Sequence, residues 1–252
     1  MRKLSIIFIL VLNFSFSFGQ ELKKQYQDVI SNFIDCFKTQ NKEKLSNLIS
    51  FPLKREYPIP DIKNKQEFLK RYKEIFDDNL TQMIVKSKPT KDWCEMGWRG
   101  LMFLNGDIWL ETNGKLIAVN YQSNFEKLKL LELIDADKLS LHESIRKFER
   151  PEILLETSKY RIRIDNLGNN IYRYASWLIN SKMSDKPNLV LLNGKFVFDG
   201  SGGNGSYVFK NGDYIYECGI ILMGEKGSPP ADLTISKGGK EIFYQKAKII
   251  RN

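Results

Sequence analysis

The sequence predicts an α+β protein with two unlike halves, helices followed by an antiparallel sheet and then an all-β half. Between Val29 and Met83, apolar residues recur at helical spacing. Asn-Gly pairs at 105–106 and 113–114 separate short apolar runs, a strong hairpin pattern because both turn residues adopt positive φ. Beyond Arg150, short alternating runs are separated by glycine and proline turns. We therefore expect helices on a curved antiparallel sheet, followed by a β-sandwich-like domain.

The first nineteen residues have the pattern of a secretory signal peptide. Arg2 and Lys3 precede an apolar run over 4–18, and Gly19 stands just before the expected cleavage at Gln20. The run is shorter than the ~20 residues that a spanning helix needs, so we expect no stable membrane span. The predicted location is the periplasm or the outside of the cell.

The boundaries follow the changes in composition. After the signal peptide (1–19) we place an α+β domain (20–123), a charged connector (124–150) and a β-sandwich domain (151–252). The connector is too apolar to be a free tether, so we expect it to pack along one of the domains.

Composition excludes several classes of site. The net charge is +9, but no dense Lys/Arg cluster is present, which argues against nucleic-acid binding. The single histidine, His142, excludes a multi-histidine metal site, and three separated cysteines exclude a zinc ribbon. The glycines at 200–205 match a dinucleotide fingerprint, but strands are expected on both sides instead of a following helix. We therefore predict no cofactor. In an oxidising compartment the cysteines allow one disulfide and one free thiol.

Two amphipathic helices are predicted in the first domain. One carries a stripe from Val29 to Phe37, and the other runs from about Lys65 to Met83 with Asn64 as its N-cap. The prolines between 51 and 62 indicate a loop or an edge strand.

The two hairpins sort the following side chains onto opposite faces. If each turn has two residues, Met102 faces Trp109 and Ile108 faces Val119. The apolar face, expected to pack on the helices, carries Leu101, Phe103, Ile108, Leu110, Ile117, Val119 and Tyr121. The opposite face is mixed and includes Trp98, Met102, Asp107, Trp109 and Glu111. Because two tryptophans lie there, we predict a binding surface unless the β-domain or a second subunit covers it.

The helical stripes and the run Gly97-Trp-Arg-Gly-Leu-Met102 through Asn105-Gly-Asp-Ile-Trp109 resemble the nuclear transport factor two-like (SnoaL-like) superfamily in the order of elements. The resemblance covers 20–123. It implies a cone-shaped pocket between helices and sheet, used by enzymes and by plain binding modules. It implies no single activity, and the Asp–His pair of some enzymatic members has no counterpart here.

Candidate strands of the second half are 152–157, 160–165, 171–177, 188–192, 195–199, 206–210, 213–222, 231–236 and 241–250. A hairpin across Asn211-Gly212 places Tyr207, Phe209, Tyr214 and Tyr216 on one face. Such rings form either a platform for sugars or part of the core. We favour the core, because a sandwich strand buries one face.

Arg161, Arg163 and Arg173 alternate with aromatic residues on these strands. An arginine pair binds acidic groups on a partner, whereas a guanidinium packed on a ring is structural, and both alternatives stay open. Asp107 and Glu111 flank Trp109, which invites an acid–base interpretation. Their expected position outside the cone favours an interface instead.

We conclude from the sequence that an exported, non-catalytic binding protein of the cell envelope is the leading function. Its partner would be an envelope protein, a glycan or a small apolar ligand, and a homodimer is a further alternative. The second hypothesis is an enzyme with a small pocket in the SnoaL-like domain that uses Asp, Glu or Tyr chemistry.

Overall fold

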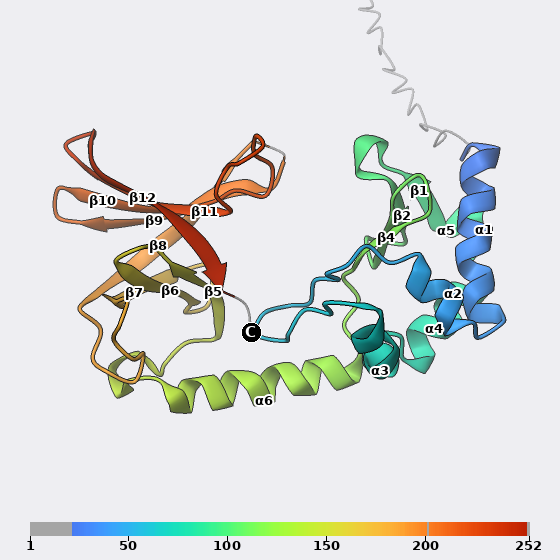
Figure 1. The fold of residues 1–252 in the computed structure, drawn as a ribbon, viewed down its shortest axis with the longest axis horizontal. Helices are drawn as coiled ribbons and strands as arrows, with labels where there is room; N and C mark the ends of the chain where they lie inside the picture. Colours follow the sequence, from blue (N-terminus) through green and yellow to red (C-terminus); the bar gives the residue numbers. More distant parts are fainter. Residues whose placement is uncertain (1–21, 201, 251–252) are drawn as a thin grey trace, which may run out of the picture.

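The computed structural model describes residues 22–200 and 202–250. It consists of a helical module, a long helix α6 and a β-barrel (Figure 1). The predicted signal peptide, 1–19, lies outside the described residues. Over the two described ranges, no helix combines the length and the apolar character that crossing a membrane requires.

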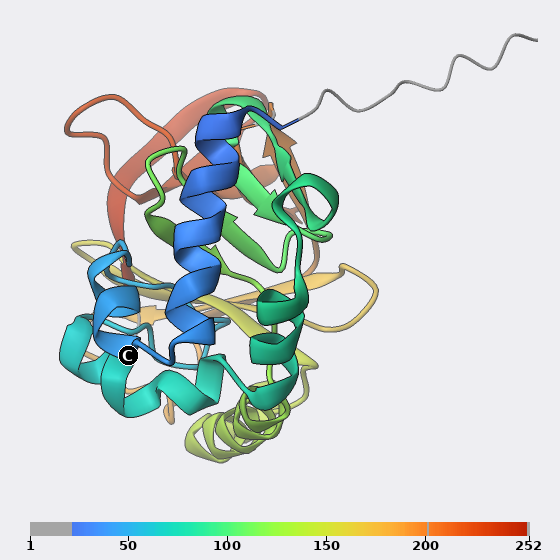
Figure 2. The same ribbon diagram turned by 90° about the vertical axis from the view of Figure 1, so that its right-hand side faces the viewer.

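The helical module packs five helices against a small four-stranded sheet. The helices are α1 (Lys24–Lys38), α2 (Lys42–Asn47), α3 (Lys65–Ile75), α4 (Asp78–Lys86) and α5 (Pro89–Asp92). The sheet has the order β1 (Trp93–Glu95), β2 (Leu101–Phe103), β3 (Ile108–Leu110) and β4 (Leu116–Val119). Helix α1 crosses one face of this sheet (Figure 2). The core between them is rich in aromatic side chains, including Phe33, Phe37, Phe68, Phe76, Trp93 and Phe103.

The second predicted helix is divided into two. Asn64 caps α3 as expected, since its side chain accepts a hydrogen bond of 3.0 Å from Glu67 N. The chain then leaves the helix at Phe76, and the Asp77 carboxylate caps α4 through Leu80 N at 2.8 Å. The apolar stripe that predicts one helix therefore belongs to two helices, because Asp77 caps the start of a new one.

The hairpin predictions hold at their centres and fail near one turn. Met102 pairs with Trp109 and Ile108 pairs with Val119, as predicted. A bulge after Trp109 then pairs Leu110 with Leu116, so Leu116 takes the buried place predicted for Ile117. One extra residue in a strand reverses the facing of those that follow.

The second half is a closed barrel of antiparallel strands in sequential order, with β12 pairing back onto β5. The strands are β5 (Arg150–Glu156), β6 (Tyr160–Asn166), β7 (Tyr172–Leu178), β8 (Leu189–Asp199), β9 (Asn204–Asn211), β10 (Tyr214–Ile220), β11 (Ala231–Lys237) and β12 (Lys240–Ile250). Closure leaves no free sheet edge, and each strand turns alternate side chains inward.

For three of the four rings of the tyrosine-rich hairpin, which face the barrel interior, the core interpretation is confirmed. Tyr207, Phe209 and Tyr216 belong to the interior cluster. The observed register pairs Phe209 with Tyr216, whereas a two-residue turn at Asn211-Gly212 would place Phe209 opposite Tyr214. A shift of two residues preserves which face each side chain takes. The predicted break between strands 188–192 and 195–199 is wrong: one strand, β8, runs through Asn193 and Gly194 with a register shift against β7.

The predicted fold class, SnoaL-like helices on a curved sheet followed by a β-sandwich, is wrong. The first module has a small sheet of strands only three or four residues long. The second is a barrel that closes on itself. The alternation of side chains is the same in a sandwich and in a barrel. Only the long-range pairing of β12 with β5 separates the two, and no local pattern encodes it.

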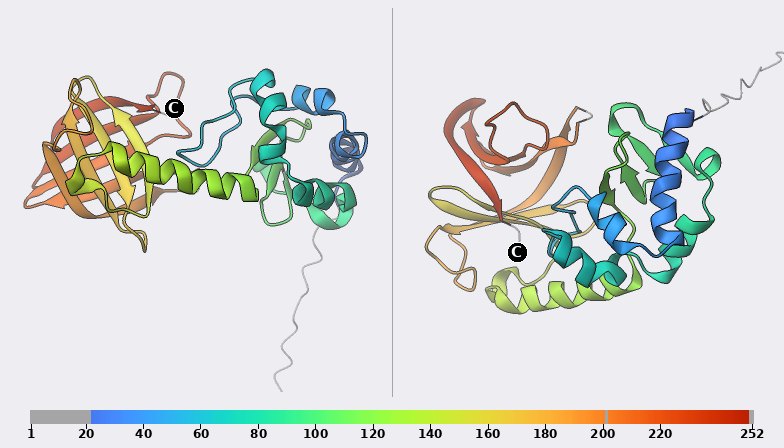
Figure 3. Two further views of the ribbon diagram at one scale, coloured as in Figure 1. Left: turned by 90° about the horizontal axis from the view of Figure 1, so that it is seen from below. Right: turned by 45° about the vertical axis from the view of Figure 1, so that its right-hand side comes forward.

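Helix α6 (Asn124–Ser140) joins the two modules, running from the helical module to the barrel (Figures 1 and 3). At its start, the buried Arg55 guanidinium pairs with Glu126, with Nε 2.6 Å from Oε1. Near its end, Asp137 receives hydrogen bonds from the buried Arg163 of β6, one of them 3.0 Å long. A short 3₁₀ turn, η2 (Glu143–Ile145), then leads into the barrel.

We expect Arg55→Met to destabilise the protein by about 3–5 kcal/mol, because it leaves the Glu126 carboxylate buried without its partner. Lys54→Met is the matched control. Its partner Asp61 lies 2.8 Å away, but the Lys54 side chain is 60% exposed, so the expected loss is below about 1 kcal/mol. Urea unfolding of both variants measures the difference. Equal losses of unfolding free energy in the two variants would show that the buried Arg55–Glu126 pair stabilises the protein no more than the exposed Lys54–Asp61 pair.

The three cysteines are free thiols in the structure, so the disulfide that an oxidising compartment allows is not formed. Burial raises the pKa of all three thiols, but Cys94 is only half-buried, whereas Cys36 and Cys218 are buried. We expect iodoacetamide to label Cys94 in the native protein, and all three after unfolding, because the reagent must reach the sulfur and only the thiolate reacts. Intact-mass measurement counts the labels. If two of the three cysteines stay unlabelled in the unfolded protein, they form a disulfide.

Candidate functional site

A groove of about 670 Å³ lies on the face of the small sheet that points away from the helices. Its lining combines two indole rings with planar polar groups: Gly97, Trp98, Arg99, Gly100, Trp109, Glu111, Thr112, Ile117, Ala118 and Asn120. Three of the residues singled out in the sequence, Trp98, Trp109 and Glu111, therefore lie together here. The groove has the size of small-molecule sites in proteins.

Trp98 stands on a 3₁₀ turn, η1 (Gly97–Arg99), which connects β1 and β2. Its side chain is 73% exposed, which is unusual for so large an apolar ring. The loop is closed by a 2.8 Å hydrogen bond from Met96 N to Gly100 O. Gly100 has a φ of 95°, and a Cβ there would lie 2.2 Å from Leu110 O. Only glycine allows the loop to approach β3 this closely.

Trp109 forms the half-buried wall of the groove. Its indole Nε1 donates a 3.1 Å hydrogen bond to Gly106 O. The Arg99 guanidinium lies 5.9 Å from the centre of its ring, a cation–π arrangement. Met102 is its cross-strand partner and is not among the residues that line the groove.

The two carboxylates of this strand are separated. Glu111 lines the groove, and Asn113 Nδ2 donates to its Oε2 at 2.9 Å. Asp107 lies in the preceding turn, where its backbone oxygen accepts from Asn120 N at 2.8 Å, and it does not line the groove. The arrangement does not bring a pair of carboxylates to one reacting centre.

Of the three arginines singled out in the sequence, Arg163 and Arg173 are buried and Arg161 is half-buried. Arg163 donates to Asp165 at 2.7 Å and Arg173 donates to Asp165 at 2.6 Å, under α6 and η2. Both guanidinium groups also lie over the Phe148 ring, 4.9 and 5.8 Å from its centre. Arg161 pairs with Glu156 at 2.7 Å. In this structure the first two bind acidic groups of their own chain and leave no exposed face for a partner.

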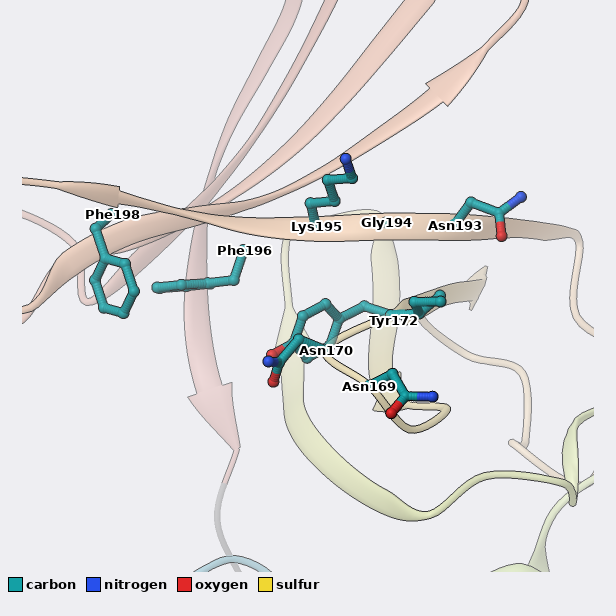
Figure 4. Close-up of a pocket in the computed structure, with 9 residues that line it drawn as sticks. Asn169, Asn170, Tyr172, Asn193, Gly194, Lys195, Phe196 and Phe198 are labelled. Carbon is teal, nitrogen blue, oxygen red and sulfur yellow. The ribbon is translucent and has the colours of Figure 1, made fainter.

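A second pocket, of about 600 Å³, lies where β8 continues past the beginning of β7 (Figure 4). The rings of Tyr172, Phe196 and Phe198 border it, and Phe198 is 72% exposed. Three asparagines with positive φ surround the rings: Asn169, Asn170 and Asn193. Asparagine tolerates this conformation better than other residues with a side chain, so it also supplies amide groups at such turns.

Sequence reasoning missed Arg99 and Thr112 as groove residues, and it missed the whole second pocket. For Arg99 a signal existed, since Gly97 and Gly100 bracket it and glycines mark a turn. For the second pocket none existed, because Asn193-Gly194 predicts a hairpin turn, and a bulge there uses the same residues.

Comparisons with protein-family models, with curated proteins and with solved structures found no match to this chain. The resemblance to the SnoaL-like superfamily stays a prediction. Any function must be argued from the chemistry of the sites themselves.

We expect Gly100→Ala to destabilise the protein by more than about 2 kcal/mol and to displace Trp98, because the new Cβ would collide with the β3 backbone. Gly97→Ala is the matched control. Gly97 also has a positive φ, 61°, but nothing lies within 4 Å of a Cβ there. The expected cost is only the left-handed strain of about 1 kcal/mol. Urea unfolding and tryptophan emission report both effects, and equal costs would disprove the close approach.

Proposed function

We propose that this protein is a non-catalytic binding protein of the cell envelope that holds a neutral oligosaccharide in the Trp98–Trp109 groove. The observation that carries the proposal is the exposed Trp98 ring beside a half-buried Trp109 in a groove of about 670 Å³. Export rests on the sequence pattern of residues 1–19.

The chemistry of the groove fits a sugar. A pyranose ring has an apolar C–H face that packs on an indole, and a rim of hydroxyls that both donate and accept hydrogen bonds. Arg99 and Asn120 supply donors there, whereas Glu111 and Thr112 supply acceptors. One cation and one carboxylate balance each other, which favours a neutral ligand over a charged one.

Two observations favour binding over catalysis. Most glycoside hydrolases use two carboxyl groups, one on either side of the scissile bond, and Glu111 is the one carboxylate among the described residues that line the groove. The alternative, an enzyme, would need a pocket between the helices and the sheet, but packed aromatic rings fill that space. Phe37 and Phe76 lie 5.0 Å apart there, and Trp93 and Phe103 lie 4.8 Å apart.

The test is a screen of the mature chain against immobilised neutral and acidic oligosaccharides, followed by titration of the best neutral ligand with tryptophan emission as the readout. We expect Trp98→Ala to weaken binding by at least about tenfold, the usual cost of truncating a central aromatic contact. Phe198→Ala is the matched control, an equally exposed aromatic ring on the other module, and it should leave the affinity unchanged.

Three other outcomes would assign the saccharide site or the groove differently. If Phe198→Ala abolishes binding and Trp98→Ala does not, the saccharide site is the pocket of Figure 4. If native mass spectrometry shows a dimer that Trp98→Ala dissociates, the groove is a subunit interface. If no oligosaccharide binds, and a protein retained from the envelope is released by Trp98→Ala, the partner is a protein.

A further inference from the structure

The barrel interior is filled unevenly along its axis. At the end where β5 and β7 begin, aromatic rings occupy the space. The Phe196 ring lies where a Gly205 Cβ would be, 2.5 Å away, and it packs 4.7 Å from the Tyr207 ring. Tyr172 lies 5.0 Å from Tyr207 on the other side. Glycine on one strand therefore makes room for a ring on the next, and these rings fill the interior beside the pocket of Figure 4, which Tyr172 and Phe196 also border.

Near the middle, a layer of three rings crosses the interior. The Phe209 ring lies against Gly194, 2.1 Å from where a Cβ would be. Tyr174 packs 5.6 Å from Phe209 and 5.9 Å from Tyr216. This layer separates the filled half of the barrel from the other half.

Above this layer, at the end where β6, β8 and β10 begin, a pocket of about 450 Å³ opens into the barrel. Tyr174 and Tyr216 belong to its lining and form its floor. Its walls and mouth are made by Tyr160, Ser176, Asn188, Leu189, Tyr214, Leu233, Ile235, Ile242 and Phe243. Ile242 and Asn188 are exposed at the mouth, so a ligand has a path from solvent.

The lining is apolar and aromatic, with neutral polar groups at a few places. No charged side chain is among the described residues that line it. Lys237, beyond the lining, places its ammonium 4.9 Å from the centre of the Tyr214 ring. Burial raises the pKa of the Tyr174 hydroxyl, so at neutral pH the floor presents neutral hydroxyls of Tyr174 and Ser176. An ion entering this site would lose its hydration without gaining a counter-charge.

We propose that this end of the barrel is a second ligand site, which takes a small, neutral, mainly apolar molecule that carries a ring. Ring faces pack on the tyrosines and on Phe243, and one hydroxyl or carbonyl group of the ligand meets the polar floor. An eight-stranded barrel has room for one such ligand when its side chains leave part of the interior unfilled. The site is separate from the groove on the helical module and does not depend on the function proposed for it.

The test uses N-phenyl-1-naphthylamine, a neutral dye whose emission rises in apolar surroundings, with the mature chain. We expect saturable binding at one site per chain. The anionic dye 1-anilinonaphthalene-8-sulfonate should bind at least about tenfold more weakly, because no charged side chain lines the pocket and Lys237 lies beyond the lining, on the Tyr214 ring.

Leu189→Trp fills the pocket and should weaken binding of the neutral dye by at least about tenfold. Leu192→Trp, on the same strand at a residue that is 54% exposed, is the matched control and should change the affinity by less than about twofold. Ile242→Glu adds a charge at the exposed mouth without altering the core and should also weaken binding. Trp98→Ala should have no effect.

Three results would overturn the proposal: no saturable emission with the neutral dye, equal affinity for the anionic dye, or undiminished binding in Ile242→Glu together with Leu189→Trp. Thermal unfolding of each variant shows that the barrel is intact when the affinities are compared.

Discussion

The arrangement of the two modules depends on buried arginines at both ends of α6. At its start, Arg55 pairs with Glu126 and also donates to the backbone oxygens of Val119 and Tyr121. Near its end, Arg163 holds Asp137 against the barrel. Between these points the helix exposes Leu128 and Leu131, so its middle is not fixed by a continuous apolar contact. Because α6 buries few apolar side chains, ion pairs hold it in place. Their arginines are buried, so water cannot take the place of a lost partner.

This constraint decides which surfaces remain for function. Strand β7 turns Tyr174 into the barrel and Trp177 outward, and both are buried, because the α6–η2 segment covers the outer side of β6 and β7. The charged residues on that side are used for docking. What stays accessible is the sheet face that carries Trp98 and the two ends of the barrel. Ligand sites at the mouth of a barrel and on a sheet face use rigid strands to position loop residues.

Much of the local structure could be predicted from the sequence, because it depends on neighbouring residues. Alternation along β7 and β10, the Asn64 cap and the Met102–Trp109 pair all follow from short-range patterns. Two kinds of feature could not be predicted. One is closure, which depends on β12 meeting β5 across most of the domain. The other is the bulge at Asn193, where a turn signal and a bulge signal use the same residues because both require positive φ.

The candidate sites show the same limit at the level of single side chains. Arg163, Arg173 and Trp98 all stand out in the sequence as large side chains able to bind a partner. Their environments differ. Asp137 and Asp165 supply carboxylates to the two arginines. Trp98 lies on an exposed loop whose close approach to β3 requires glycine at position 100. Asp137 is 26 residues away from Arg163 in sequence and reaches it from α6. A charged side chain is therefore a weak predictor of a binding surface, because the chain itself can satisfy it. An exposed indole supported by its own loop glycine has no such partner within the described chain, and this makes the tryptophan the better guide to function.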